Sequence, residues 1–244
     1  MNDLPLLDKT ILVSGAARRV GRLFALACAR AGANVIIHHG HSQPEALEVQ
    51  KEIAALGRQS WIIEADLSKP EEASRLIFTA NKINPFHGLV NSAAIFEPLS
   101  LEQTSLADWE RHLAINLTAP FLMSQAFAKQ IPSDGEGRIV NILDWRALRP
   151  GADHFPYTVS KAALAAMTKS MAVALAPRIT VNGLALGAVL PPANEAMDEK
   201  LIKQVPAKRW GDTREIEEAL IFLLAGPAYV TGEIIHVDGG RHLV

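Results

Sequence analysis

A tyrosine and a lysine stand four residues apart in Tyr157-Thr158-Val159-Ser160-Lys161, thirteen positions after Asp144. If this segment is helical, the spacing places the phenol and the ammonium group on one face of the helix. A cation beside a phenol favours the charged form of the phenol and lowers its pKa, which makes the hydroxyl a usable proton donor or acceptor near neutral pH. Taken alone, the pair is equally compatible with two surface residues on a helix, so its meaning depends on the rest of the chain.

A glycine-containing turn near the N-terminus supplies a second chemical feature. The apolar run Ile11-Leu12-Val13 leads into Ser14-Gly15-Ala16-Ala17-Arg18-Arg19-Val20-Gly21 and then into a segment rich in alanine and leucine. Small residues let the backbone approach a pyrophosphate, and a helix that begins there directs free N–H groups and its positive dipole end toward the anion. A strand, a glycine-rich turn and a helix in this order predict a dinucleotide site, with an ordinary tight turn as the alternative.

Together these motifs resemble the short-chain dehydrogenase/reductase family, whose fingerprint is T-G-x-x-x-G-x-G followed by an active-site Asn, Ser, Tyr and Lys. The resemblance extends along nearly the whole chain, through Asp66-Leu67, Asn91-Ser92-Ala93-Ala94, Asn116 and Val230-Thr231-Gly232. Arg19 stands where the middle glycine would be, and Asp144 stands where the catalytic serine would be. Both departures are similar to the pteridine reductase branch, and the segment from Asp238 to Leu243 resembles the ending of dihydromonapterin reductases.

The resemblance implies a set of site residues. Tyr157 is expected to donate the proton, Lys161 to assist by its charge and to bind the ribose, and Asn116 to order a water. Phe96 is expected to stack on a pterin ring beside Asp144 and Tyr157. The residues expected to bind the cofactor are Ser14, Gly15, Arg18, Arg19, Val20, Gly21, His38, His39, His41, Ser42, Asp66, Leu67, Asn91, Ser92, Ala93, Lys161 and Gly187.

The segment after the second predicted strand indicates which dinucleotide is bound. Val35-Ile36-Ile37 leads into His38-His39-Gly40-His41-Ser42, and no acidic residue lies between Ala33 and Pro44. An NAD-selective site commonly has a carboxylate here for the ribose 2′-hydroxyl, whereas a 2′-phosphate needs cations and donors. The sequence therefore favours NADPH. A metal site at the histidines is disfavoured, because alternate strand residues point to opposite faces and no Cys or carboxylate is close by.

Asp144 bears on the choice of substrate. An ionised carboxylate about 4 Å from a developing alkoxide would repel it by roughly 4 kcal/mol at an effective dielectric near 20. A pterin instead offers N–H and amino donors to a carboxylate, and the reduction of its imine needs a proton on nitrogen. We therefore expect NADPH-dependent reduction of a dihydropteridine of the dihydrobiopterin, dihydromonapterin or dihydrofolate type to its tetrahydro form.

Two other functions stay open. If burial keeps Asp144 neutral at pH 7, its carboxyl can donate as the serine would, and the argument against ketones weakens. The chain would then be an NADPH-dependent carbonyl reductase similar to 3-oxoacyl-carrier-protein reductases. The third possibility is an NADP-binding regulator without turnover, against which the intact Tyr-Lys-Asn set argues.

The elements that position these residues follow from the apolar pattern. Continuously apolar runs of strand length occur at residues 10–14, 34–38, 61–64, 88–91, 138–143, 179–184 and 233–237, and segments of helix length at 44–57, 70–83, 101–131 and 157–176. This alternation predicts a single doubly wound α/β (Rossmann-like) domain over residues 1–244, with a parallel seven-stranded sheet flanked by helices. In such a sheet ligands bind beyond the carboxyl ends of the strands, where Gly15, Asp66, Asn91, Asp144 and Gly187 fall. Residues 188–208 correspond to a substrate lid in the family.

Composition limits the remaining possibilities. A chain of 244 residues with 49% hydrophobic and 20% charged residues suits one domain, and a net charge of −2 gives no reason to expect nucleic acid or an anionic membrane as a partner. The single cysteine, Cys28, cannot form an internal disulfide and is expected to be buried. No signal peptide or membrane span is recognisable, so we expect a cytoplasmic protein. The alanine-rich segment 162–176 predicts a helix at a subunit interface, hence a homo-oligomer, dimer or tetramer.

Overall fold

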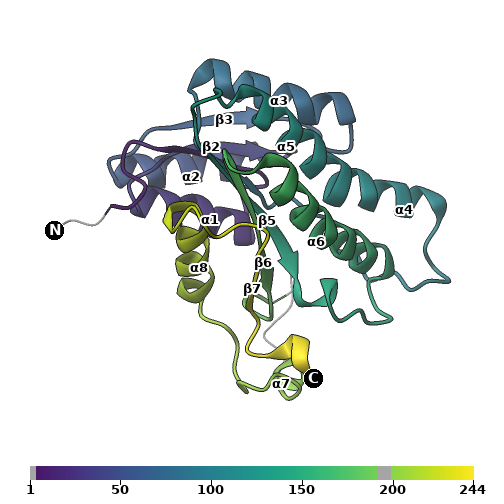
Figure 1. Ribbon diagram of the computed structural model, residues 1–244. Helices are drawn as coiled ribbons and strands as arrows, with labels where there is room; N and C mark the ends of the chain where they lie inside the picture. Colours follow the sequence, from purple (N-terminus) through teal and green to yellow (C-terminus); the bar gives the residue numbers. More distant parts are fainter. Residues whose placement is uncertain (1–3, 192–198) are drawn as a thin grey trace.

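The computed structural model describes residues 4–191 and 199–244. Seven strands form one sheet in the order β3-β2-β1-β4-β5-β6-β7, and every neighbouring pair is parallel (Figure 1). The strands are β1 (Thr10–Val13), β2 (Asn34–His39), β3 (Ser60–Glu64), β4 (Gly88–Asn91), β5 (Gly137–Asp144), β6 (Ile179–Leu186) and β7 (Ile234–Val237). The chain order reverses between β1 and β4, which is where a doubly wound sheet opens a ligand crevice.

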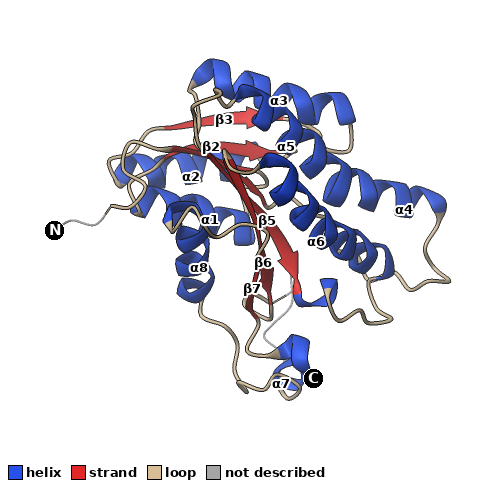
Figure 2. Ribbon diagram, in the orientation of Figure 1, coloured by secondary structure: helices blue, strands red, loops and turns tan. Residues whose placement is uncertain are grey.

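Helices cover both faces of the sheet, as the layers in Figure 2 show. They are α1 (Arg19–Arg30), α2 (Gln43–Ala55), α3 (Pro70–Ile83), α4 (Leu106–Leu113), α5 (Ala119–Gln130), α6 (Phe155–Leu175), α7 (Glu199–Ile202) and α8 (Thr213–Ala225). One apolar core joins α1, α2 and α8 to the sheet, and a second joins α3 and α5 to its other side. Because both faces are covered, all eight residues of β6 are buried, and this explains the uninterrupted apolar runs in the sequence. The predicted fold is confirmed.

Two helical regions differ from the sequence-based expectation. The segment expected to be one helix over 101–131 consists of α4 and α5, joined by a π-helical turn at Ala114–Thr118. Helix α8 was not given a range from the sequence, although Asp212 and Glu215 form a capping box at its start that could have located it. The π-helical turn has no comparable local signal in the sequence; it contains Asn116, which contacts Ile95 and Ser160, both distant in the chain.

Several expectations concern regions or properties that the structure describes only in part. The expected lid, residues 188–208, includes residues 192–198, which lie outside the described residues, so the lid stays a prediction, as does the homo-oligomer. Cys28 is a free cysteine buried within α1, as expected. Over the described ranges, no helix combines the length and the apolar character needed to cross a membrane.

Candidate active site

A cavity of about 510 Å³ opens at the carboxyl ends of the central strands. Most of the predicted site residues line it, from β1 and α1 through β4 to β5 and α6: Gly15, Arg18, Arg19, Val20, Gly21, His38, His41, Asp66, Leu67, Ser92, Ala93, Phe96, Asp144, Tyr157, Lys161 and Gly187. Ser14, His39, Ser42, Asn91 and Asn116, also predicted, do not appear in its lining. The topology thus brings residues from both ends of the chain to one site.

The turn between β1 and α1 touches the segment after β4. Gly15 has a positive φ of 66°, and a Cβ there would lie only 2.9 Å from Ala93 Cα, so the position requires glycine. The hydroxyl oxygen of Ser14 accepts hydrogen bonds from the backbone N–H groups of Ser92 at 2.9 Å and Ala93 at 3.1 Å. Ser14 therefore shapes the phosphate-binding turn from behind, rather than facing the cavity.

Arg19 keeps the backbone conformation of the glycine that the family has at this position. Its φ is 52°, in the left-handed region, which costs a residue with a side chain roughly 1–2 kcal/mol. Its Nη2 donates to the Pro191 carbonyl oxygen at 2.5 Å, while the Arg18 guanidinium is paired with the Glu45 carboxylate. Two guanidinium groups thus stand at the cavity's edge beside the loop after β2, which carries no acid.

The three histidines at the end of β2 have different environments. His38 Nδ1 accepts a hydrogen bond from the Gly15 N–H at 3.1 Å and its Nε2 lies 3.0 Å from the Ala65 carbonyl oxygen, so both ring nitrogens are engaged. Burial lowers the pKa of His38 to about 4, which keeps the ring neutral. His39 is buried with Nε2 2.5 Å from Gln43 Oε1. Both ring nitrogens of His38 are engaged within the fold although its ring lines the cavity, and His39 is outside the lining, so His41 is the histidine that stays a predicted donor to a phosphate.

Asp144, Tyr157 and Lys161 meet at the end of β5. Asp144 is the last residue of that strand, and Tyr157 and Lys161 lie one turn apart on α6, as their spacing predicted. The Tyr157 hydroxyl donates to Asp144 Oδ2 at 3.3 Å. Lys161 Nζ donates to the Ile142 carbonyl oxygen at 2.7 Å and lies 5.7 Å from the centre of the Tyr157 ring. The three polar groups therefore surround one point of the cavity.

The protonation of these groups differs from the expectation that Lys161 lowers the pKa of the phenol. The pKa of Tyr157 is raised well above 10, because the phenol is buried and because Asp144 lies beside it. Burial lowers the pKa of Lys161 to about 8, partly offset by Asp144. Burial also raises the pKa of Asp144, against the opposing effects of the Arg146 N–H group, the Arg146 charge and Lys161. Loss of hydration is the dominant cause at all three residues.

Phe96 and its surroundings form the outer wall of the site. Its ring packs edge-on against Tyr157 with centroids 4.7 Å apart, and it stacks on the His154 ring at 3.8 Å with an interplanar angle of 6°. Phe96 is 43% exposed, so it lines the cavity instead of forming part of the core. Sequence reasoning missed His154, which immediately precedes α6 and has a left-handed backbone conformation.

Arg146 is a second residue that sequence reasoning missed. Its Nη1 lies 3.6 Å from Asp144 Oδ1, its backbone N–H donates to the same oxygen at 2.9 Å, and its Nη2 donates to Asp153 Oδ2 at 2.9 Å. It therefore fixes the orientation of the Asp144 carboxyl. The sequence holds only a weak signal for this role of Arg146, namely that it stands two residues after Asp144.

Asn116 is a positioning residue. It lies in the π-helical turn, where its Oδ1 accepts from the Ile95 N–H at 2.9 Å and its Nδ2 donates to the Ile95 carbonyl oxygen and to Ser160 Oγ, both at 3.1 Å. Both hydrogens of the Asn116 amide are used. A water ordered by Asn116, as expected from the sequence, would therefore have to bind the second lone pair of Oδ1 or the backbone. π-Helical turns of this kind are frequent at functional sites.

The other predicted residues outside the cavity lining have structural surroundings. Asn91 donates to Asn141 Oδ1 at 2.7 Å and to Ser124 Oγ at 3.2 Å within the core beside β5, and Ser42 precedes α2 without a side-chain cap hydrogen bond. Across residues 4–191 and 199–244, no three His, Cys, Asp or Glu side chains converge in a way that could hold a metal ion.

Comparisons with known proteins add an independent line of observation. A protein-family profile described as Enoyl-(Acyl carrier protein) reductase matches residues 15–242. The chain is 33% identical over 234 residues to a 3-oxoacyl-[acyl-carrier-protein] reductase of Synechocystis sp., with 94% of this chain and 95% of that protein covered. It is 35% identical over 246 residues to the 3-oxoacyl-[acyl-carrier-protein] reductase FabG of Aquifex aeolicus, with 98% and 99% covered.

Solved structures give a second set of similarities. The structure is similar to FolM Alternative dihydrofolate reductase 1 from Brucella canis complexed with NADP, with a TM-score of 0.92, 31% identity, and 99% of this chain and 96% of that chain covered. It is also similar to a blue fluorescent protein from a metagenomic library in complex with NADPH, with a TM-score of 0.90, 32% identity, and 97% and 99% covered.

Proposed function

The chain belongs to the short-chain dehydrogenase/reductase family of oxidoreductases, and we propose that it uses NADPH to reduce a dihydropteridine to its tetrahydro form. The observation that carries the substrate assignment is the placement of the Asp144 carboxyl. It lines the cavity and lies 3.3 Å from the Tyr157 hydroxyl, where the family has a serine. A carboxyl at this point is suited to a substrate that offers nitrogen-bound hydrogens.

The shape and charge of the cavity fit NADPH. Gly15 and the start of α1 line the cavity, where the free N–H groups and positive dipole end of a helix N-terminus favour a pyrophosphate. Arg18, Arg19 and His41 line the edge of the cavity near the loop after β2, where a 2′-phosphate needs cations. The solved relatives bound to NADP and NADPH support the same choice.

The chain's own residues supply the proton. NADPH, when bound, supplies the hydride, which goes to the carbon of the C=N bond. The nitrogen then needs a proton, and Asp144 retains one to higher pH than an ordinary aspartate because its carboxyl is buried. The Tyr157 hydroxyl is hydrogen-bonded to that carboxyl, and the buried Lys161, whose pKa is about 8, can hold a proton near neutral pH. Asp144 and Tyr157 thus form a two-residue proton relay, with Lys161 behind it.

The walls of the cavity fit a flat heterocycle. Phe96 offers an aromatic wall, which would favour an offset-stacked ring by about 1 kcal/mol beyond the burial of its area. Arg146 holds the Asp144 carboxyl by its backbone N–H, so the orientation of the acceptor and donor oxygens toward the ring is fixed before binding. Preorganised groups of this kind do not have to reorient during the reaction.

A carbonyl reductase acting on 3-oxoacyl thioesters is the second candidate. Two observations favour it: the similar curated proteins are 3-oxoacyl-[acyl-carrier-protein] reductases, and the raised pKa of Asp144 lets its carboxyl donate to a carbonyl oxygen as a serine would. The two candidates differ in which atom receives the proton, a ring nitrogen or a carbonyl oxygen.

Steady-state assays with NADPH separate the candidates. We expect turnover of 7,8-dihydrobiopterin with a kcat/KM at least tenfold above that for acetoacetyl thioesters. A clear preference for the thioester would overturn the pteridine assignment and establish the carbonyl reductase. Failure to turn over either compound, with NADPH bound in a fluorescence titration, would point to the non-catalytic regulator.

A further inference from the structure

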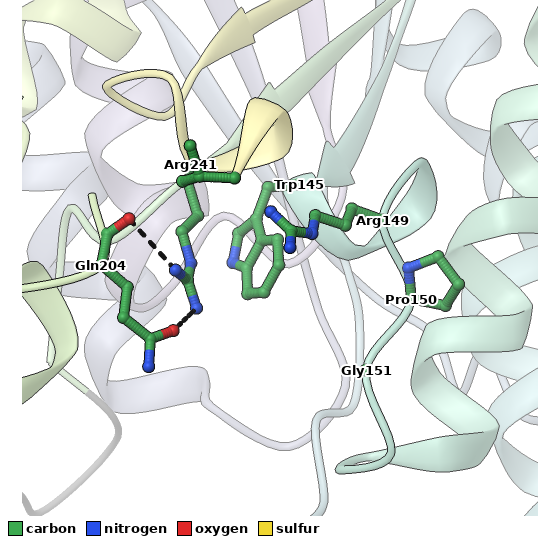
Figure 3. A pocket seen from close by; sticks show the side chains of 7 residues that line it. Trp145, Arg149, Pro150, Gly151, Gln204 and Arg241 are labelled. Atoms are coloured by element: carbon green, nitrogen blue, oxygen red, sulfur yellow. Dashed lines mark hydrogen bonds between the residues drawn. The ribbon is translucent and has the colours of Figure 1, made fainter. Parts of the chain in front are cut away.

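A second cavity of about 480 Å³ lies beside the active site and is rich in arginine. Trp145, the residue after Asp144, stands at its centre, and Arg149, Gln204 and Arg241 are among the residues that line it (Figure 3). Arg241 comes from the C-terminal segment after β7, so the cavity joins parts of the chain that are far apart in sequence. Within the described part of the chain, none of the contacts in the active site uses Arg149 or Arg241.

Guanidinium groups surround the Trp145 indole. The Cζ atoms of Arg146 and Arg241 lie over the indole ring, at 4.6 Å and 4.7 Å from its centre. Arg149 lines the same cavity, and in the view of Figure 3 its guanidinium lies beside Trp145, opposite Arg241. Stacking on an indole holds a guanidinium in place while leaving its N–H groups free at the edge.

The positive charge of this cluster, Arg146, Arg149 and Arg241, is incompletely neutralised. Arg146 pairs with Asp144 and Asp153, whereas Arg241 donates to the Gln204 carbonyl oxygen at 3.2 Å and to the Gln204 side chain, which is neutral. Among the described residues, Arg149 has no ion-pair partner. Burial is the main cause that lowers the pKa of Arg241, and the nearby charges of Arg149 and Arg146 lower it further.

The cluster is continuous with the proposed substrate site. Arg146 contacts both: its Cζ is 5.7 Å from the centre of the Phe96 ring and 4.6 Å from the centre of the Trp145 ring. The Cζ of Arg241 is 4.7 Å from the centre of the same Trp145 ring. A substrate whose ring lies against Phe96 can therefore extend a side chain along Arg146 and Trp145 toward Arg241.

We propose that the cavity around Trp145 binds a carboxylate on the side chain of the substrate through Arg241 and Arg149. The inference rests on the proposed function, because it places the substrate ring beside Phe96 and Asp144. Among dihydropteridines, this cavity would favour those that carry an aryl-linked carboxylate, such as dihydrofolate, over those with short neutral side chains. Guanidinium groups match the planar geometry of a carboxylate, and the indole is suited to an aryl linker.

Competition kinetics test the specificity. For the wild type and for Arg241→Gln, kcat/KM is measured with 7,8-dihydrofolate and with 7,8-dihydrobiopterin. We expect the ratio of kcat/KM for dihydrofolate to kcat/KM for dihydrobiopterin to fall about tenfold or more in Arg241→Gln. The change should appear as a higher KM for dihydrofolate, because one charge-assisted pair is lost. Arg149→Gln, which removes no described contact of the fold, should lower the ratio as well. Arg241→Lys should restore part of it, and Arg75→Gln on α3 serves as the control that leaves it unchanged.

A binding measurement keeps the subsite separate from the proposed reaction. Isothermal titration of the NADPH-loaded enzyme with N-(4-aminobenzoyl)-L-glutamate should show binding that weakens about tenfold in Arg241→Gln. If neither pteridine is reduced but this dependence is found, the proposed function fails and the carboxylate site stands. If dihydrobiopterin is reduced but the probe binds wild type and variant equally, the proposed function stands and the carboxylate site is wrong. Tighter binding of a phosphate monoester than of the probe would overturn the carboxylate assignment too.

Discussion

The Tyr157 hydroxyl, on α6, donates a hydrogen bond across 3.3 Å to Oδ2 of Asp144 at the end of β5; Tyr157 is buried and Asp144 is half-buried. This contact distinguishes the site from one with a serine, because a carboxyl can hold a proton, release it and accept a hydrogen bond in turn. Since burial raises the pKa of Asp144 and that of Tyr157, the pair resists loss of its protons. Such a pair is suited to protonating a ring nitrogen.

Replacing Tyr157 by phenylalanine tests the phenol directly. We expect kcat to fall by about 10²-fold or more, which is the typical contribution of a positioned general acid, while NADPH binding followed by fluorescence stays close to wild type. The phenyl ring preserves the edge contact with Phe96, so a folding defect is not expected. A variant with kcat near the wild-type value would show that the phenol takes no part in the proton relay.

The pH dependence of turnover should report on Asp144. The protonated carboxyl is the proposed donor, so kcat for 7,8-dihydrobiopterin should fall as pH rises through the pKa of Asp144, which burial holds above its ordinary value. Asp144→Asn cannot titrate, so this falling limb should be missing from its profile, while a limb from Lys161 should remain and shift to lower pH, because the Asp144 charge raises the pKa of Lys161. Identical profiles for the two proteins would assign the titration to another group.

Lys161 is expected to lower the stability of the fold. Its pKa drops from 10.5 in an ordinary lysine to about 8, so burying the charged form costs roughly 3 kcal/mol. Replacement by methionine also removes the hydrogen bond to the Ile142 carbonyl oxygen, so we expect a net gain in the free energy of unfolding of roughly 1–2 kcal/mol at pH 7, with activity lost.

The pH dependence of that gain provides the control. Between pH 8 and 10.5 the unfolded state binds more protons at Lys161 than the folded state, so the wild type gains stability as pH rises. The difference between Lys161→Met and wild type in urea unfolding should therefore shrink over this range. A difference that stays constant with pH would mean that the buried ammonium group carries no penalty.

Arg19 should determine the preference for NADPH. Arg19→Gly restores a residue suited to a φ of 52°, so the backbone of the turn is preserved while the guanidinium is removed. We expect Kd for NADPH to rise about tenfold and Kd for NADH to stay the same, because the 2′-phosphate alone loses a partner. Arg22→Ala is the matched control. Arg22 lies on the same helix but pairs with Glu52, so its loss should leave both Kd values unchanged. Equal effects on both dinucleotides would place Arg19 away from the 2′-phosphate.

Residues whose role depends on local spacing were predictable from the sequence. Three features each lie within one element and its neighbour: the apolar run that ends at Asp144, the Tyr157–Lys161 spacing and the turn at Gly15. The hydrophobic periodicity and the turn residues of the sequence are therefore enough to locate them. The alternation of apolar runs with helical segments likewise fixes the doubly wound class. These features require no knowledge of distant contacts.

Features that depend on burial and long-range contacts were not predictable. The sequence suggested that Lys161 lowers the pKa of Tyr157, but the buried position of both groups makes the loss of hydration dominant. The neutral state of His38 follows from its burial, which depends on elements distant in sequence: its ring nitrogens contact Gly15 and Ala65, which are 23 and 27 residues away. Arg241 meets Trp145 across almost a hundred residues, and no pattern in either segment indicates the contact.

The measurement that bears most directly on the role of Asp144 is the specificity of Asp144→Ser. With NADPH, kcat/KM is determined for 7,8-dihydrobiopterin and for acetoacetyl thioesters in the wild type and in the variant. We predict that the serine variant loses pteridine reduction by about 10²-fold or more, because a hydroxyl cannot supply the proton that the carboxyl holds, while thioester reduction is kept or gained. Pteridine turnover that is unchanged in Asp144→Ser would contradict the assignment of the carboxyl as the group that selects a nitrogen substrate.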